Sequence, residues 1–190
     1  MLRLLTRLLW KLSGWHIESL PPRSGKFILL IAPHTSNWDF VVLYLLKESQ
    51  GFKAAWMGKH TLFNIPILGC FFRWTGGIPI DRTASQNTVS VMTARFSETS
   101  NLMLTLAPEG RRRHAPHWRS GFYRIARAAQ VPLCLGYMDY PSKSVGFSPL
   151  IHLSGALKDD MNQIRAFYEG KRGKRPQNAA PIRLRDETTI

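Results

Sequence analysis

Apolar runs and helical patterns alternate along most of this chain. The continuous apolar run at residues 27–32 predicts a strand buried on both faces. Residues 102–107 and 131–137 predict further strands, and residues 78–80 predict a shorter one. Helical periodicity marks four further segments, at residues 37–48, 84–98, 122–129 and 159–168. Because strands alternate with helices, the sequence predicts an α/β fold: a single domain with a largely parallel central sheet flanked by helices.

Residues 1–20 have a pattern of their own. Five leucines share one face of a helical wheel and three basic residues lie on the opposite face: Leu2, Leu5, Leu8, Leu9 and Leu12, against Arg3, Arg7 and Lys11. Such an amphipathic helix is typical of a segment lying in the plane of a membrane surface, with Trp10 and Trp15 at the level of the headgroups. An ordinary surface helix packed on the core gives the same pattern, so both interpretations stay open.

The rest of the chain reads as one domain with a tail. No internal repeat or interdomain linker interrupts residues 21–170, which we expect to form the main domain. Residues 171–190 are rich in Lys, Arg, Pro and Asn, which predicts a basic, mobile tail. Cys70 and Cys134 lie in apolar runs without metal-ligand spacing, and we expect two buried thiols. No apolar stretch approaches the roughly 18 residues of a membrane-spanning helix.

The composition is that of a folded protein with a strong positive charge. Hydrophobic residues make up 44% of the 190 residues and charged residues 20%, which argues against disorder. The formal net charge of +14 favours a polyanionic partner: nucleic acid, anionic lipid headgroups or a phosphorylated substrate. A basic nucleic-acid-binding module would use residues 171–175 and Arg183. The aromatic residues lie mainly in apolar runs instead of alternating with those basic groups, so no nucleic acid is expected.

Residues suited to acid–base chemistry follow the first predicted strand. His34 and Asp39 belong to the segment PHTSNWD, and the loop beyond the carboxyl end of a strand is the usual ligand position in an open α/β sheet. A histidine there can act as a general base near neutral pH, and a carboxylate can hold its ring in the useful tautomer. A loop that turns into a helix can bring Asp39 back onto the imidazole. In the alternative interpretation, Asp39 merely favours a helix N-terminus and His34 ends the strand.

Two further clusters combine glycine and arginine at predicted strand ends. Residues 76–82, GGIPIDR, place a glycine turn before the short strand and Arg82 after it, where a guanidinium suits phosphate oxygens. Residues 108–113, PEGRRR, follow the strand at residues 102–107. Glycine permits close approach to a ligand, and three adjacent arginines repel one another unless an anion is bound. A solvated turn is the alternative for each cluster; for residues 108–113 we favour a bound anion.

In this order, the clusters resemble the glycerolipid acyltransferases of the lysophosphatidate (1-acylglycerol-3-phosphate) acyltransferase family. That family carries a His-four-residues-Asp motif, a Gly-x-x-Phe-Ile-Asp-Arg motif, a Phe-Pro-Glu-Gly-Thr-Arg-Ser motif and a Val-Pro-Ile type strand. The corresponding segments here are residues 34–39, 76–82, 107–113 and 131–133. Pro79 stands where the family has Phe, and Arg111 and Arg113 stand where it has Thr and Ser. These departures bear on the acceptor and leave the reaction class intact.

The resemblance implies transfer of a fatty acyl group from acyl-CoA or acyl-ACP to the hydroxyl of a lysophospholipid-type acceptor, 1-acylglycerol-3-phosphate being the leading candidate. In such a site His34 is the base, and Asp39 orients it and stabilises the imidazolium. The implied substrate-binding residues are Lys59, Arg82, Glu109, Gly110 and Arg112. Neither a cofactor nor a metal is expected.

The resemblance also implies an anionic membrane partner and a peripheral or monotopic place on the cytoplasmic face of a membrane. Residues 62–74, which are apolar almost throughout, would then line an acyl groove, dip into the bilayer or fill the core. A non-catalytic lipid-binding protein on the same fold is the alternative.

Overall fold

A central seven-stranded sheet organises the molecule, which the computed structural model describes over residues 2–80 and 85–188. The strands are β1 (His16–Ile17), β2 (Lys26–Ile31), β3 (Ala55–Lys59), β4 (Gly77–Ile80), β5 (Leu102–Leu106), β6 (Leu133–Asp139) and β7 (Ser144–Ile151). Their order in the sheet is β1-β7-β6-β2-β5-β3-β4, and every neighbouring pair is parallel except β6 and β7. The predicted α/β fold with a largely parallel sheet is confirmed.

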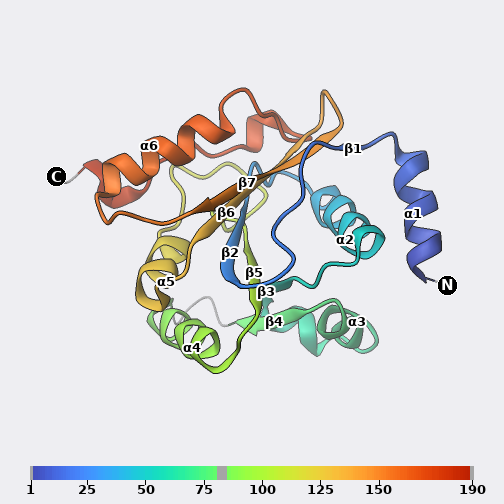
Figure 1. The fold of residues 1–190 in the computed structure, drawn as a ribbon, viewed down its shortest axis with the longest axis horizontal. Helices are drawn as coiled ribbons and strands as arrows, with labels where there is room; N and C mark the ends of the chain where they lie inside the picture. Colours follow the sequence, from blue (N-terminus) through green and yellow to red (C-terminus); the bar gives the residue numbers. More distant parts are fainter. Residues whose placement is uncertain (1, 81–84, 189–190) are drawn as a thin grey trace.

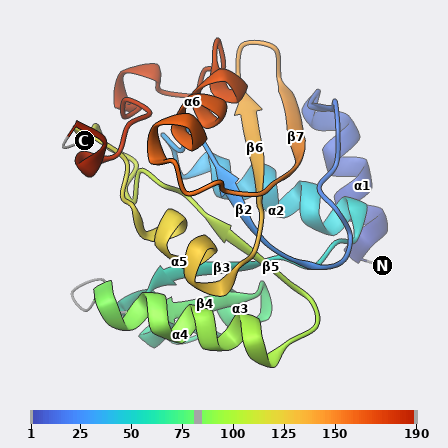
Figure 2. The ribbon, with the colours of Figure 1, turned by 60° about the vertical axis from the view of Figure 1, so that its left-hand side comes forward.

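Helices cover both faces of the sheet, as Figure 2 shows. The helices α1 (Leu2–Ser13) and α2 (Trp38–Gln50) lie on one face, and α4 (Ser85–Glu98), α5 (Gly121–Ala129) and α6 (Leu157–Tyr168) lie on the other. The helix α3 (Leu68–Trp74) and the 3-10 helix His60–Asn64 lie beside β3 and β4 at one end of the sheet (Figure 1).

The side chains of β2 alternate between the two layers. Ile28 and Leu30 pack with the core under α4, α5 and α6, whereas Phe27, Leu29 and Ile31 pack with the core under α1 and α2. Both faces of this strand are therefore buried, which is why its sequence is a continuous apolar run.

The register of the strands brings two loops together at the carboxyl edge of the sheet. β2 pairs with β5 so that Ile28 lies opposite Leu104, and Leu30 lies opposite Leu106. Because the two strands are parallel and in step, the loops that follow them begin side by side. The first of these loops contains His34 and the second contains Glu109.

Three strands have no clear signal in the sequence. β3 is short and only its Gly58 is buried, so it lacks the apolar run of a core strand. β7 contains Gly146 and Pro149, which interrupt a strand pattern, and β1 is two residues long. Pro79 is compatible with β4 because β4 is an edge strand, where a missing N–H costs no hydrogen bond within the sheet.

The predicted N-terminal helix is present, packed on α2. Thr6 and Trp10 are its buried residues, and Arg7 donates a hydrogen bond (3.1 Å) to the carbonyl of Ser49 near the end of α2. Trp10 is a core residue, so the prediction that it lies at headgroup level is wrong: the ring points toward the domain. The exposed apolar residues are Leu2, Leu4, Leu5, Leu8, Leu9 and Leu12. Within residues 2–80 and 85–188, no helix combines the length and hydropathy needed to cross a membrane.

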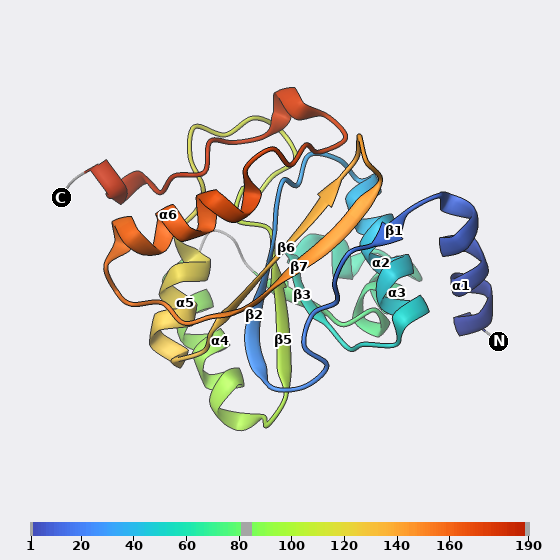
Figure 3. The ribbon, with the colours of Figure 1, turned by 45° about the horizontal axis from the view of Figure 1, so that its top comes forward.

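The C-terminal segment packs on the domain, contrary to the expected mobile tail. Ala180 and Leu184 belong to the buried core, and the amide of Trp118 donates to the carbonyl of Arg183 (2.8 Å). Figure 3 shows this segment running beside the loop that follows β5. The abundance of Lys, Arg, Pro and Asn hides the few apolar side chains that hold it in place.

The two cysteines have different surroundings. Cys134 on β6 is buried as predicted, and burial raises the pKa of its thiol to about 12. Cys70 is exposed, so its predicted burial is wrong: α3 turns this position toward solvent.

Candidate active site

His34 and Asp39 are hydrogen-bonded at the carboxyl edge of the sheet. His34 lies in the loop after β2, and Asp39 lies in the first turn of α2. The Nδ1 atom of His34 is 3.1 Å from Oδ2 of Asp39. The carboxylate thus folds back onto the imidazole as the sequence predicts. Because Nδ1 is engaged, Nε2 is the ring nitrogen that remains for a ligand in the cavity lined by His34.

The carboxylate of Asp39 is fully buried and held from several sides. Besides the His34 ring, Oδ2 accepts hydrogen bonds from the amides of Thr35 (2.8 Å) and Ser36 (2.9 Å), and Oδ1 accepts one from the hydroxyl of Tyr140 (2.8 Å). Burial alone would raise the pKa of Asp39. The hydrogen bond and charge of His34, together with hydrogen bonds from the Ser36 amide and the Tyr140 hydroxyl, bring the pKa below its ordinary value. Asp39 is therefore ionised and able to steady an imidazolium.

Tyr140 is a member of this site that sequence reasoning misses. It lies in the turn between β6 and β7, and its ring packs edge-on against Trp15 with centroids 5.0 Å apart. Its amide also donates to the carbonyl of Arg172 (2.9 Å). Burial and the neighbouring Asp39 carboxylate raise the pKa of Tyr140, so its hydroxyl stays protonated and able to donate. A tyrosine just after a predicted strand carries no signal that separates it from a core aromatic.

Glu109 supports the loop that carries His34. It is buried, and its Oε1 accepts a hydrogen bond from the backbone amide of His34 (3.0 Å). Its Oε2 has no hydrogen-bond partner among the described residues. Burial, with a smaller contribution from the Asp39 charge, raises the pKa of Glu109 to about 7, although the His34 amide opposes the shift. The side chain thus sits beneath the histidine loop and not in the open part of the cavity.

An open cavity of about 1760 Å³ is lined by His34, Gly110 and Arg112. A guanidinium nitrogen of Arg112 donates to the Asn37 side chain, which brings this arginine beside the histidine loop. Gly110 has a φ of 69°, and a Cβ there would lie 2.7 Å from Cδ of Arg119. The backbone conformation therefore favours glycine at position 110.

The remaining predicted site residues lie elsewhere or outside the description. Lys59 ends β3 opposite Ile80, and its exposed side chain does not line the cavity. Arg82 falls outside the described residues. In the described part of the chain, no three His, Cys, Asp or Glu side chains gather in the way a metal ion requires.

Part of the cavity is apolar. It extends between α2 and the β3–α3 region, where Phe40, Tyr44, Trp56 and Phe72 line it. Phe40, Trp56 and Phe72 pack edge-on against one another, with the Phe40 and Trp56 centroids 5.3 Å apart, and Tyr44 stacks on Phe40. The apolar segment 62–74 is split between three locations. Phe63 is buried in the core, Leu62 and Phe72 line the cavity, and Ile65, Ile67, Leu68, Phe71 and Trp74 are exposed.

The fold and the site define an α/β domain with a histidine–aspartate pair beside an arginine-lined cavity. A model of the Acyltransferase family matches residues 16–138, which is more than half of the chain. The chain belongs to this family.

Two known proteins are similar to it. The 1-acyl-sn-glycerol-3-phosphate acyltransferase of Streptococcus pneumoniae is 29% identical over 131 residues, which are 67% of this chain and 48% of that protein. The chain thus spans about half the length of this curated relative. The crystal structure of the 1-acyl-sn-glycerophosphate (LPA) acyltransferase PlsC from Thermotoga maritima matches with a TM-score of 0.53 and 16% identity, over 88% of this chain and 75% of that one. At this identity the match shows a shared fold.

Proposed function

We propose that this chain is an O-acyltransferase that moves a fatty acyl group from an acyl thioester, acyl-CoA or acyl-ACP, to the hydroxyl of a lysophospholipid-type acceptor. The leading acceptor is 1-acylglycerol-3-phosphate, which the relatives' names also suggest. The observation that carries the proposal is the 3.1 Å contact between His34 and a buried, ionised Asp39 at the edge of an arginine-lined cavity.

The chemistry requires one base and no covalent acyl-enzyme. Nε2 of His34 takes the proton of the acceptor hydroxyl as its oxygen attacks the thioester carbonyl carbon. The carbon–sulfur bond breaks when the tetrahedral intermediate collapses, and the thiolate takes the proton back from the imidazolium. Asp39 keeps the ring oriented by binding Nδ1 and stabilises its transient positive charge.

The cavity supplies separate environments for the two parts of a lysolipid. Arg112, held beside the histidine loop through Asn37, is placed to bind a phosphate. The apolar part between α2 and the β3–α3 region suits an acyl chain. An acceptor hydroxyl between a bound phosphate and a bound chain then lies near His34.

The exposed leucines of α1 support a membrane surface as the partner. The net charge of +14 favours a surface of anionic lipids, and we place the protein on the cytoplasmic face of such a membrane. Thr6 and Trp10 anchor α1 to the domain, which leaves its leucine face without a described protein partner. Apolar side chains on α3 and the segment before it, including Ile67 and Trp74, offer a second exposed group. Both groups would enter the headgroup layer of a bilayer.

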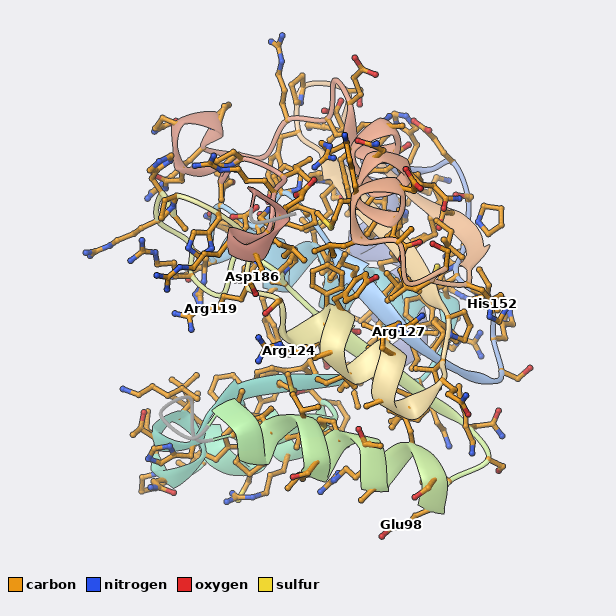
Figure 4. The ribbon with its side chains drawn as sticks, turned by 90° about the vertical axis from the view of Figure 1, so that its left-hand side faces the viewer. Glu98, Arg119, Arg124, Arg127, His152 and Asp186 are labelled. Carbon is orange, nitrogen blue, oxygen red and sulfur yellow. The ribbon has the colours of Figure 1, made fainter. Side chains whose placement is uncertain are left out.

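The decisive experiment is an acyl-transfer assay with the His34→Ala variant. We expect loss of transfer from acyl-CoA and acyl-ACP to lysophosphatidate, with an unchanged circular dichroism spectrum. His152→Ala is the matched control, because His152 is exposed and lies far from Arg119 at the cavity rim in Figure 4. Full activity of His34→Ala would remove this histidine from the mechanism. Absence of transfer by the wild-type chain with every lysolipid tested would favour a non-catalytic lipid-binding role.

A further inference from the structure

The cavity carries more positive charge than one acceptor phosphate requires. The arginines that line it are Arg111, Arg112, Arg113, Arg119, Arg124, Arg175 and Arg185. Asp186 is the one carboxylate among the described lining residues, and it lies 3.8 Å from Arg124. A phosphate monoester carries about two negative charges near neutral pH, which two or three guanidinium groups can bind. The arginines also come from several elements; Figure 4 shows Arg119 on the loop and Arg124 on α5.

Part of this charge comes from the C-terminal segment, which is built into the site. The amide of Arg175 donates to Oγ1 of Thr35 (3.2 Å), next to His34. The side-chain amide of Asn178 donates to the carbonyls of Thr35 (3.4 Å) and Arg112 (3.0 Å). A Cβ at Gly173 would lie 2.5 Å from Oγ1 of Thr35, so glycine allows the segment to approach this closely. Residues 173–178 thus hold both the histidine loop and the arginine loop.

Four of the guanidinium groups that line the cavity are available to a ligand. Arg111, Arg113, Arg119 and Arg175 are exposed, and none of them forms an ion pair with a described carboxylate. Like charges held together on neighbouring loops repel one another, and a bound polyanion removes that repulsion.

We propose that Arg175 and the loop arginines Arg111, Arg113 and Arg119 form a second phosphate site, distinct from the one expected at Arg112, for a substrate that carries two or more phosphate groups. Two substrates have this chemistry. One is the CoA part of the donor, whose diphosphate and 3′-phosphate carry about four negative charges. The other is a lysolipid acceptor with a second phosphate on its headgroup. The proposed function identifies these two candidates, but the binding site itself does not depend on acyl transfer.

The test compares ligand pairs that differ by one phosphate, using calorimetry on the purified chain. The donor pair is CoA and dephospho-CoA. The acceptor pair is lysophosphatidylinositol 4-phosphate and lysophosphatidylinositol, below their micelle concentrations. In at least one pair we expect the extra phosphate to lower Kd about tenfold, which corresponds to one charge-assisted contact. The responsive pair identifies the source of the polyanion.

Variants then locate the site. The double variant Arg113→Gln and Arg175→Gln should abolish most of that preference, whereas Arg95→Gln, on the exposed surface of α4, should keep it. Equal affinities within both pairs, or a preference that survives in the double variant, would overturn the proposal. His34→Ala should bind as tightly as wild type. A binding preference without any acyl transfer would thus count against the proposed function alone.

Discussion

The hydroxyl of Tyr140 donates a hydrogen bond to the Oδ1 atom of Asp39 over 2.8 Å, although the two residues are 101 positions apart. This contact connects the turn between β6 and β7 to the histidine–aspartate pair. The same tyrosine packs on Trp15, and its amide donates to the carbonyl of Arg172, so it connects segments near both ends of the chain to the Asp39 carboxylate.

We expect Tyr140→Phe to lower kcat about tenfold or more while KM for the acceptor changes little. The substitution leaves a buried carboxylate oxygen without its donor, which costs roughly 1–3 kcal/mol, and it weakens the orientation of the imidazole. The acidic limb of the pH–rate profile should also move to higher pH, since the donor that helps to lower the pKa of Asp39 is gone.

Tyr123→Phe is the matched control for that prediction. Tyr123 donates to Oδ2 of Asp160, also over 2.8 Å, but this pair joins α5 to α6 and does not include Asp39. Both variants lose one tyrosine–aspartate hydrogen bond and should lose similar stability. An equal loss of kcat in the two variants would show that Tyr140 has only a structural role.

The second prediction concerns Glu109 and pH. Its pKa is raised from 4.5 to about 7 in the folded chain, so the folded state binds this proton more tightly than the unfolded state. The associated stability is present below pH 4.5 and is lost as the pH rises through about 7. At about 1.4 kcal/mol per pH unit the loss amounts to roughly 3 kcal/mol.

Glu109→Gln does not titrate, and its amide oxygen can still accept from the His34 amide. The free energy of unfolding of wild type, minus that of the variant, should therefore fall between pH 4 and pH 8. The lowered pKa of Asp39 makes the free energy of unfolding rise with pH instead. Asp39 is present in both proteins, so its contribution cancels in the difference. Urea denaturation at several pH values measures this quantity. A constant difference across the range would mean that folding leaves the pKa of Glu109 unchanged.

The third prediction is that the leucine face of α1 binds membranes. The triple variant Leu4→Ser, Leu8→Ser and Leu12→Ser should reduce co-sedimentation with anionic vesicles by more than about tenfold, because three apolar side chains no longer enter the headgroup layer. Val91→Ser, which removes an exposed apolar side chain on α4, should have little effect. Unchanged sedimentation of the triple variant would exclude α1 as the anchor. Unlike deletion of the helix, these substitutions keep Trp10 in the core.

The strands flanking the active-site loops could be predicted from the sequence because both faces of each strand are buried. Residues 27–31 of β2 form a continuous apolar run for that reason, and β5 is apolar apart from Thr105. The parallel pairing of the two strands places His34 next to Glu109. The pairing of His34 with Asp39 could also be anticipated, since it depends on one short loop. Contacts between distant segments could not be predicted, because nothing in the sequence around Tyr140 indicates that it faces Asp39.

The C-terminal segment shows a second limit. Its composition indicates disorder, yet Ala180, Ile182 and Leu184 pack against the core. The average composition of the segment is dominated by charged residues and hides these few apolar side chains. Whether they pack depends on a matching surface of the folded domain, which the local sequence does not reveal. The position of Arg175 beside the cavity could not be predicted for the same reason, because a residue in a mobile tail is not expected to line a cavity.

The fourth prediction concerns acceptor binding by Arg112. We expect Arg112→Ala to raise the KM for lysophosphatidate about tenfold, with a smaller change in kcat, since the lost group binds a part of the substrate that does not react. Arg95→Ala controls for the loss of one positive charge. An unchanged KM would contradict the assignment of the acceptor phosphate to Arg112.

The last prediction tests the packing of the C-terminal segment through Leu184. This side chain is 3% exposed, and residue 184 forms an isolated bridge with Trp118. Leu184→Ala should lower the free energy of unfolding by about 2–4 kcal/mol, as expected for a leucine truncated in a packed core. Leu150→Ala, at a position that is 40% exposed, should cost much less. If the two variants were equally stable in urea, the segment from residue 171 would not be part of the folded core. The Arg175 site would then lose its structural basis, because the same packing holds that arginine beside Thr35.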